Sequence, residues 1–114
     1  MIDKLFQSID AKNADAFAAL IAPDGEFCFA NLPPVVGRDA VREFVTGFFA
    51  SIASVSHVVE ASWQVADALI CQGRVSYTRH NGSVLTVPFA NVMRTSPSGF
   101  TRYQIYADTS ALYT

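Results

Sequence analysis

The order of the hydrophobic patterns predicts an α+β protein, in which helices come first and a largely antiparallel sheet follows. Apolar residues at helical spacing dominate positions 2–53, interrupted by one short aromatic strand pattern. Alternating apolar and polar residues dominate positions 56–108, where turn signals separate four long segments. Helices grouped before a run of strands are typical of α+β folds, where the helices cover one face of the sheet.

The first half of the chain predicts helices around a single strand. Residues 2–22 have helical spacing, with Asn13 as a break before a second short helix and Pro23-Asp24-Gly25 as the stop. The aromatic stretch Glu26–Asn31 alternates as a strand does. Gly37–Ala53 has the strongest helix pattern, because its apolar residues, Phe48 among them, form one continuous stripe.

The second half predicts a meander of long strands. Asn81-Gly82 is a strong hairpin signal between two of them, and Pro88 indicates an edge or a bulge. A long, strongly curved sheet with helices on one face can enclose a pocket. The four strand patterns are Ser56–Val65, Leu69–Arg79, Val84–Arg94 and Phe100–Asp108.

Composition narrows the function classes. The 114 residues suit one domain, 1–114, and they are 51% hydrophobic but only 16% charged. Some apolar surface should therefore face a ligand cavity or a partner chain. The net charge of −2 and the scattered basic residues argue against nucleic-acid binding. No apolar run is long enough to cross a membrane, and the first residues do not resemble a signal peptide, so the cytoplasm is expected.

The two cysteines predict neither a disulfide framework nor a metal site. Cys28 and Cys71 lie in strand-like apolar runs and have no metal-ligand spacing. Buried free thiols are the expected state. A metal site is therefore not predicted.

Two stretches carry a resemblance to a known family. NLPPVVGRDAVREFVTGFF (Asn31–Phe49) resembles the loop and helix of limonene-epoxide-hydrolase-type proteins. GFTRYQIYADTSALY (Gly99–Tyr113) is similar to the last strand and tail of SnoaL-like proteins. With an element order that matches over nearly the whole chain, the protein resembles the SnoaL-like branch of the NTF2-like superfamily. The resemblance implies a cone: a strongly curved, mostly antiparallel sheet with N-terminal helices covering its concave face.

The resemblance also implies a homodimer that forms through the convex sheet face and a deep apolar pocket for a small hydrophobic molecule. Family activities that need no cofactor include isomerisation of ketones, polyketide cyclisation, dehydration and epoxide hydrolysis. The Asp-Arg-Asp set of the epoxide hydrolases falls on Ser76, Arg74 and Ile105, and their Tyr and Asn fall on Phe27 and Phe29. Because both acids are absent, epoxide hydrolysis is not expected.

In the same register, period-two alternation divides the strands into a pocket face and a convex face. Asn91 is a polar candidate because Asn is depleted in strands, and Asn31 lies at the loop mouth. The predicted pocket residues are Phe27, Phe29, Phe48, His57, Val59, Ala61, Trp63, Arg74, Ser76, Thr78, Val87, Phe89, Asn91, Tyr103, Ile105 and Ala107. The predicted convex residues are Val58, Glu60, Ser62, Gln64, Cys71, Val75 and Tyr77.

Four residues are candidates for catalysis, and each has a structural alternative. Arg74 could bind a carboxylate or stabilise an oxyanion, or it could face outward and pair with Glu60. His57 could act as an acid or base, or it could be a hydrogen-bonded structural histidine. Asp108 could be a general base or cap the backbone that follows it. Tyr103 could donate to a ligand oxygen or be a core aromatic residue.

Three functions remain open at this point. The first is an acid/base enzyme, an isomerase, cyclase or dehydratase acting on a ketone-like or polyketide-like molecule. The second is a ligand-binding protein or accessory dimerisation domain without catalysis, which the lack of acids in the pocket favours. The third is an export or scaffold module, which would show a peptide groove in place of a closed pocket.

Overall fold

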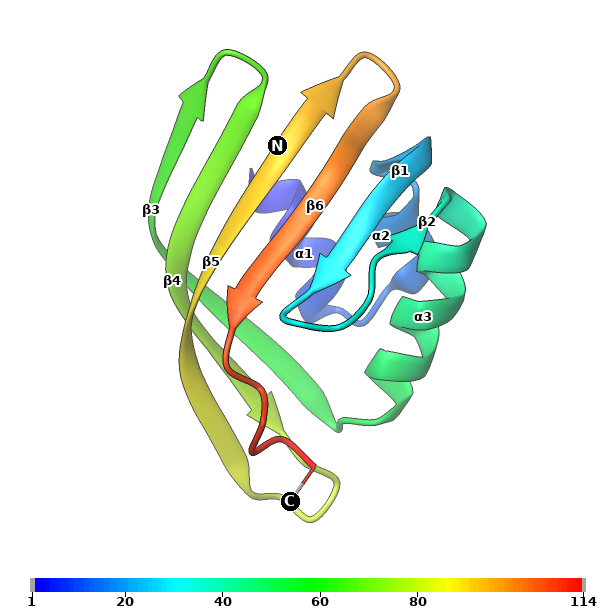
Figure 1. Ribbon diagram of the computed structural model, residues 1–114. Helices are drawn as coiled ribbons and strands as arrows, with labels where there is room; N and C mark the ends of the chain where they lie inside the picture. Colours follow the sequence, from blue (N-terminus) through cyan, green and yellow to red (C-terminus); the bar gives the residue numbers. More distant parts are fainter. Residues whose placement is uncertain (1, 114) are drawn as a thin grey trace.

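A computed structural model describes residues 2–113 of the protein. Figure 1 shows a curved, unclosed sheet with α1 and α2 behind it and α3 at one side. The six strands lie in the order β2-β1-β6-β5-β4-β3. The elements are α1 (Ile2–Asp10), α2 (Ala14–Ala18), β1 (Ile21–Phe29), β2 (Val35–Val36), α3 (Arg38–Ala50), β3 (Ser54–Val65), β4 (Ala68–Thr78), β5 (Val84–Ser96) and β6 (Gly99–Ala107).

The N-terminal helices end earlier than the helical pattern predicts. Asn13 breaks the run as expected, because its side-chain Oδ1 accepts from the backbone N–H of Ala16 and caps α2. The expected stop at Pro23-Asp24-Gly25 is wrong: α2 ends at Ala18 and β1 already begins at Ile21. Parallel pairing with β6 explains the difference, since long-range hydrogen bonding overrides local helical spacing there.

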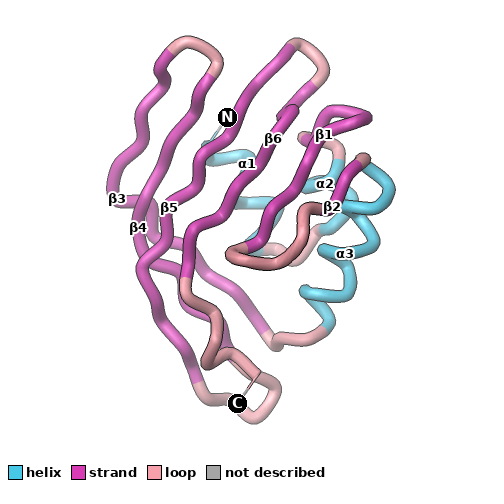
Figure 2. Tube along the Cα trace, viewed as in Figure 1, coloured by secondary structure: helices cyan, strands magenta, loops and turns pink. Residues whose placement is uncertain are grey.

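The four strands predicted for the second half are confirmed as an antiparallel meander, with ends shifted by only one or two residues. Figure 2 shows these strands side by side, joined by short loops. Pro88 lies in β5, which has neighbours on both sides, but β6 ends at Ala107 opposite Phe89. Pro88 thus lies just beyond the last pair with β6, at a local edge where a missing N–H is tolerated.

A bulge in β3 reverses the faces of the strand. Val59 pairs with Gly73 and Ala61 with Gln72, so Glu60 is the extra residue. A Cβ on Gly73 would lie 1.8 Å from the carbonyl oxygen of Val58, so only glycine fits opposite the bulge. Residues before the bulge keep the predicted alternation, and those after it are inverted.

The core lies between the concave sheet face and the helices. Side chains from α1, α2 and α3 pack on inward-facing residues of every long strand. Both cysteines are free and buried, as predicted. The largest fully buried side chains are Tyr103, Phe17, Phe100, Leu5, Ile21, Ile52, Met93 and Leu112.

Candidate functional site

A small aromatic cavity lies inside the cone. Its volume is about 40 Å³, which is room for only about two or three water molecules. Nine of its sixteen lining residues are Phe or Tyr. A larger molecule can enter only if some of these rings move. The nine are Phe17, Phe27, Phe29, Phe44, Phe48, Phe49, Tyr77, Phe89 and Tyr103.

His57 is the histidine that lines the cavity, and its imidazole is paired with a carboxylate. Its Nδ1 lies 2.7 Å from Oδ1 of Asp10, the last residue of α1. The backbone N–H of His57 donates to the other oxygen of Asp10 at 3.1 Å. Two hydrogen bonds from one residue to one carboxylate fix the position of the imidazole relative to α1. Asp10 therefore belongs to the site, although the helical pattern alone gave no sign of it.

The surroundings of His57 favour the neutral imidazole. Its side chain is only 10% exposed, and the rings of Phe6 and Phe89 lie 4.7 and 5.2 Å from it. Burial lowers the pKa of His57 below its usual 6.5, while the hydrogen bond and the charge of Asp10 act in the opposite direction. A carboxylate can only accept, so Nδ1 carries the proton and Nε2 keeps its lone pair.

Asn91 and Tyr103 form a second polar group on the cavity wall. Asn91 Nδ2 donates to the Tyr103 hydroxyl at 3.2 Å, and both residues are buried. Burial raises the pKa of Tyr103 well above its usual value of 10 and raises that of Tyr77 to about 12. Both phenols are neutral hydrogen-bonding groups at physiological pH. Burial likewise raises the pKa of the Cys71 thiol to about 11, so this cysteine is an unreactive core residue.

A wider groove of about 1060 Å³ lies at the open end of the cone. It shares the rings of Phe29, Phe44 and Phe48 with the inner cavity. These three rings separate the two spaces, so they are the side chains that would have to move for a ligand to pass. The groove is lined by Asn31, Leu32, Ser51 and the C-terminal segment as well.

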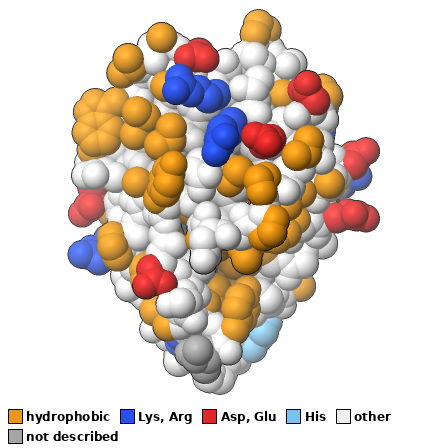
Figure 3. Space-filling view, viewed as in Figure 1, with side chains coloured by type: hydrophobic (Ala, Val, Ile, Leu, Met, Phe, Trp, Pro, Cys, Tyr) orange, Lys and Arg blue, Asp and Glu red, His pale blue; other side chains and the backbone are white. Residues whose placement is uncertain are grey.

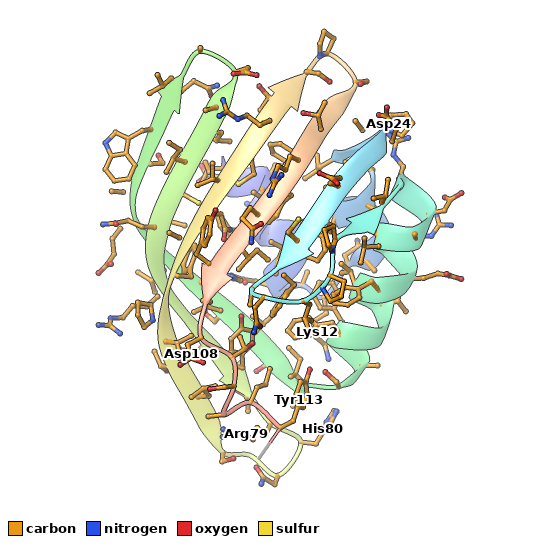
Figure 4. All side chains as sticks on the ribbon, viewed as in Figure 1. Lys12, Asp24, Arg79, His80, Asp108 and Tyr113 are labelled. Carbon is orange, nitrogen blue, oxygen red and sulfur yellow. The ribbon has the colours of Figure 1, made fainter. Side chains whose placement is uncertain are left out.

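The C-terminal segment is tied across this end of the molecule. Arg79 donates from Nε to the carbonyl of Leu112 at 3.0 Å and from Nη2 to that of Ala111 at 2.9 Å. Tyr113 shares a 2.7 Å hydrogen bond with Ser51, at the end of α3. Figure 4 shows Arg79, His80 and Tyr113 together at this end. The segment therefore forms one wall of the outer groove.

Arg74 and Ser76 do not reach the cavity, contrary to expectation. His57 pairs with Val75 across β3 and β4, and Val75 and Tyr77 line the cavity. Neighbouring residues of a strand point to opposite faces, so Arg74 and Ser76 are on the convex side. Arg74 is exposed. Within residues 2–113 its side chain forms no hydrogen bond or ion pair, so the expected pairing with Glu60 is not observed.

Other predicted site residues are also corrected. Trp63 is 49% exposed on the convex face because the bulge inverts the end of β3. Val59 and Val87 pack against the core without lining the cavity. Asp108 is exposed, and its Oδ1 accepts from the backbone N–H of Ser110 at 3.0 Å. Hydrogen bonding from the side chain of Ser110, and to a smaller extent from its backbone, lowers the pKa of the carboxyl. The capping alternative for Asp108 is therefore the one that is observed.

The remaining predicted residues have mixed positions. Asn31 lines the outer groove only. Three residues expected on the convex face are instead buried on the concave side, because they alternate with Arg74 along β4. They are Cys71, Val75 and Tyr77. Those on the inner cavity wall are Phe27, Phe29, Phe48, His57, Phe89, Asn91, Tyr103 and Ile105.

Within residues 2–113, no three His, Cys, Asp or Glu side chains are grouped so that they could hold a metal ion. Over the same range, no helix is both long enough and apolar enough to cross a membrane.

Solved structures of similar architecture come from several bacteria. A hypothetical protein of Catenulispora acidiphila with a ketosteroid isomerase-like fold, in complex with trimethylamine, is 20% identical, with a TM-score of 0.85 over 92% of this chain and 82% of its own. An NTF2-like protein of unknown function from Burkholderia pseudomallei is 17% identical, with a TM-score of 0.86 over 97% and 90%.

A third structure, described as a SnoaL-like polyketide cyclase from Jannaschia sp. CCS1, is 16% identical, with a TM-score of 0.80 over 99% of this chain and 88% of its own. At sequence identities this low, the similarity to these three structures shows only that the fold is shared. No curated protein sequence matches the chain. The model of the SnoaL-like domain matches residues 2–100, nearly the whole chain. The protein therefore belongs to the SnoaL-like domain family, with the NTF2-like fold.

Proposed function

We propose that the inner cavity binds part of a small, mainly apolar ketone-like or polyketide-like molecule and that His57 acts on it as a general base. The observation that carries this proposal is the 2.7 Å contact between His57 Nδ1 and Asp10 on the wall of an aromatic cavity. A neutral imidazole held in one tautomer has the properties of a base near pH 7. The reaction class is cofactor-free proton transfer, as in an isomerase, cyclase or dehydratase.

The proposed step is proton abstraction next to a carbonyl. Nε2 of His57 takes the proton, the electron pair of the C–H bond forms a C=C bond, and the carbonyl oxygen takes up the negative charge. The Tyr103 hydroxyl, neutral because burial raises its pKa, donates a hydrogen bond to that oxygen. Asp10 stabilises the imidazolium that forms. Return of the proton to another carbon completes an isomerisation.

Ligand binding without turnover is the second candidate. It is favoured by the small volume of the cavity and by the absence of Asp108 and Arg74 from its wall. The complex of the Catenulispora protein with trimethylamine is consistent with a small ligand in a related fold. For a larger ligand, the outer groove would hold the part that does not fit inside.

A second copy of this chain is the proposed protein partner, bound through the convex sheet face. Figure 3 shows this face, where hydrophobic side chains spread across the sheet among few charges. Two of its arginines, Arg94 and Arg102, have acidic partners in Asp67 and Glu26. The exposed apolar side chains on this face are Val58, Trp63, Val65, Val84 and Tyr106. The buried free cysteines fit the cytoplasm as its location.

The test is exchange of α-protons in D₂O, followed by proton NMR on a panel of cyclic ketones such as cyclopentanone and cyclohexanone. We expect the protein to accelerate exchange of at least one ketone and His57→Gln to reduce that acceleration about 10²–10⁴-fold. His80→Gln is the matched control, because His80 does not line the cavity and its imidazole hydrogen-bonds to the carbonyl of Ala50. Full activity of His57→Gln would rule out the proposed base. No acceleration with any ketone would favour binding without turnover.

A further inference from the structure

One buried polar atom on the cavity wall has no partner. Asn91 is 2% exposed, and its Oδ1 is the single buried side-chain nitrogen or oxygen within residues 2–113 that lacks a hydrogen bond. Buried polar groups are nearly always hydrogen-bonded, so such an exception needs an explanation. The neighbours across the strands are Cys71 and Ile105, and neither donates to this oxygen.

Tyr103, the hydrogen-bond partner of Asn91, lacks an acceptor for its own O–H. The Tyr103 hydroxyl accepts from Asn91 Nδ2 at 3.2 Å, but it donates no hydrogen bond to any residue in the described range 2–113. The centroids of the Phe17, Phe27 and Phe100 rings lie 5.4–5.7 Å from the centroid of the Tyr103 ring, and these rings supply no acceptor. The pair therefore offers one free donor, the Tyr103 O–H, next to one free acceptor, Asn91 Oδ1.

We propose that this pair recognises a hydroxyl group of the ligand. The ligand oxygen accepts from the Tyr103 O–H, and its own proton goes to Asn91 Oδ1, so one hydroxyl completes a closed ring of three hydrogen bonds. A carbonyl or ether oxygen can use only the Tyr103 donor and leaves Asn91 Oδ1 unpaired. The inference rests on the proposed function of the cavity and adds to it a ligand class: alcohols, phenols and the enol form of the ketone, whose oxygen takes the same position at Tyr103.

Water is the competing occupant, because a water molecule also donates and accepts and the cavity has room for it. A hydroxyl-bearing ligand must displace that water and reproduce its hydrogen bonds, whereas a ligand without the hydroxyl cannot do so. Comparing a hydroxyl compound with its methyl ether, in which a methyl group replaces this proton, therefore separates recognition of a hydroxyl from a cavity that holds water alone.

The experiment titrates the ¹⁵N-labelled protein with phenol and with anisole at pH 7 and follows amide shifts by NMR. Phenol is expected to bind about three- to tenfold more tightly than anisole, the range for one net hydrogen bond. Asn91→Leu should abolish this preference, and Tyr103→Phe, which keeps the ring, should reduce it as well. Met93→Leu is the control on the same face of β5 and should retain it.

Two results would overturn the inference while leaving the proposed function in place. In the first, both probes shift the amides of the cavity residues and bind with equal affinity. In the second, the preference for phenol persists in both Asn91→Leu and Tyr103→Phe. Equal affinity would mean that the cavity holds only water at this position. If neither probe shifts the cavity amides, the inferred recognition of a hydroxyl fails as well, and the exchange experiment with ketones decides the proposed function separately.

Discussion

The pair formed by His57 and Asp10 joins two residues that are 47 positions apart. Alternation along β3 correctly predicts that His57 faces inward. The role of Asp10 as the partner of His57 could not be predicted, because an acidic residue at the end of an amphipathic helix is most often a solvent-exposed charge. Only the packing of α1 on β3 brings its carboxylate to the imidazole. Sequence patterns can thus place this histidine on the inward face, but its partner depends on tertiary structure.

Replacing Asp10 by Asn should shift the ionisation of His57. The charge and the hydrogen bond of Asp10 raise the pKa, whereas burial lowers it. Asp10→Asn removes the charge and weakens the bond, so we expect the pKa of His57 to fall further below 6.5. NMR titration of the imidazole protons would measure it in both proteins. An unchanged or higher midpoint would contradict the assigned coupling.

At the scale of elements, register decides which predicted site residues reach the cavity. The apolar residues Cys71, Val75 and Tyr77 alternate along β4 and point inward, so Arg74 and Ser76 point outward. The family resemblance suggested the opposite assignment for this strand. Trp63 was misplaced for a different reason: the bulge at Glu60 has no sequence signal beyond a glycine on the facing strand.

The close approach of β3 and β4 at the bulge predicts how a substitution of Gly73 changes stability. Gly73→Ala would place a Cβ against the backbone of β3, and the free energy of unfolding should fall by about 3 kcal/mol or more. Gly47→Ala is the matched control: it has no heavy atom within 4 Å of the added Cβ and should stabilise α3 by about 1 kcal/mol. Urea unfolding of both variants measures these changes. Equal stabilities would contradict the close approach of β3 and β4.

For the whole molecule, the composition was a useful guide. The excess of apolar over charged residues predicted a ligand cavity or a partner surface, and the structure contains an aromatic cavity and exposed apolar side chains on the convex face. The α+β class and the curved sheet were predictable because the long helix and the four strands of the meander have clear periodicity, whereas the two-residue β2 and the start of β1 have none. The volume of the cavity was not, because it depends on how nine aromatic rings pack.

The exposed apolar residues of the convex face predict the oligomeric state. Light scattering coupled to gel filtration should give twice the chain mass of 12.4 kDa. Val58→Arg adds a like charge beside its cross-strand neighbour Arg74 and should yield monomers. Leu32→Arg, at an equally apolar position off this face, should remain dimeric. A wild-type monomer, or dissociation by both substitutions alike, would contradict the proposed interface.

The central claim is that neutral His57 acts as a base inside the cavity, and the pH dependence of α-proton exchange tests it most directly. Because burial lowers the pKa of His57, the base form is present above that pKa and is lost as the pH falls through it. After subtraction of the uncatalysed rate, exchange should rise with pH, level off and have its midpoint below 6.5. That midpoint should equal the one measured for His57 by NMR. A rate that is independent of pH, or that follows the same profile in His57→Gln, would contradict the account.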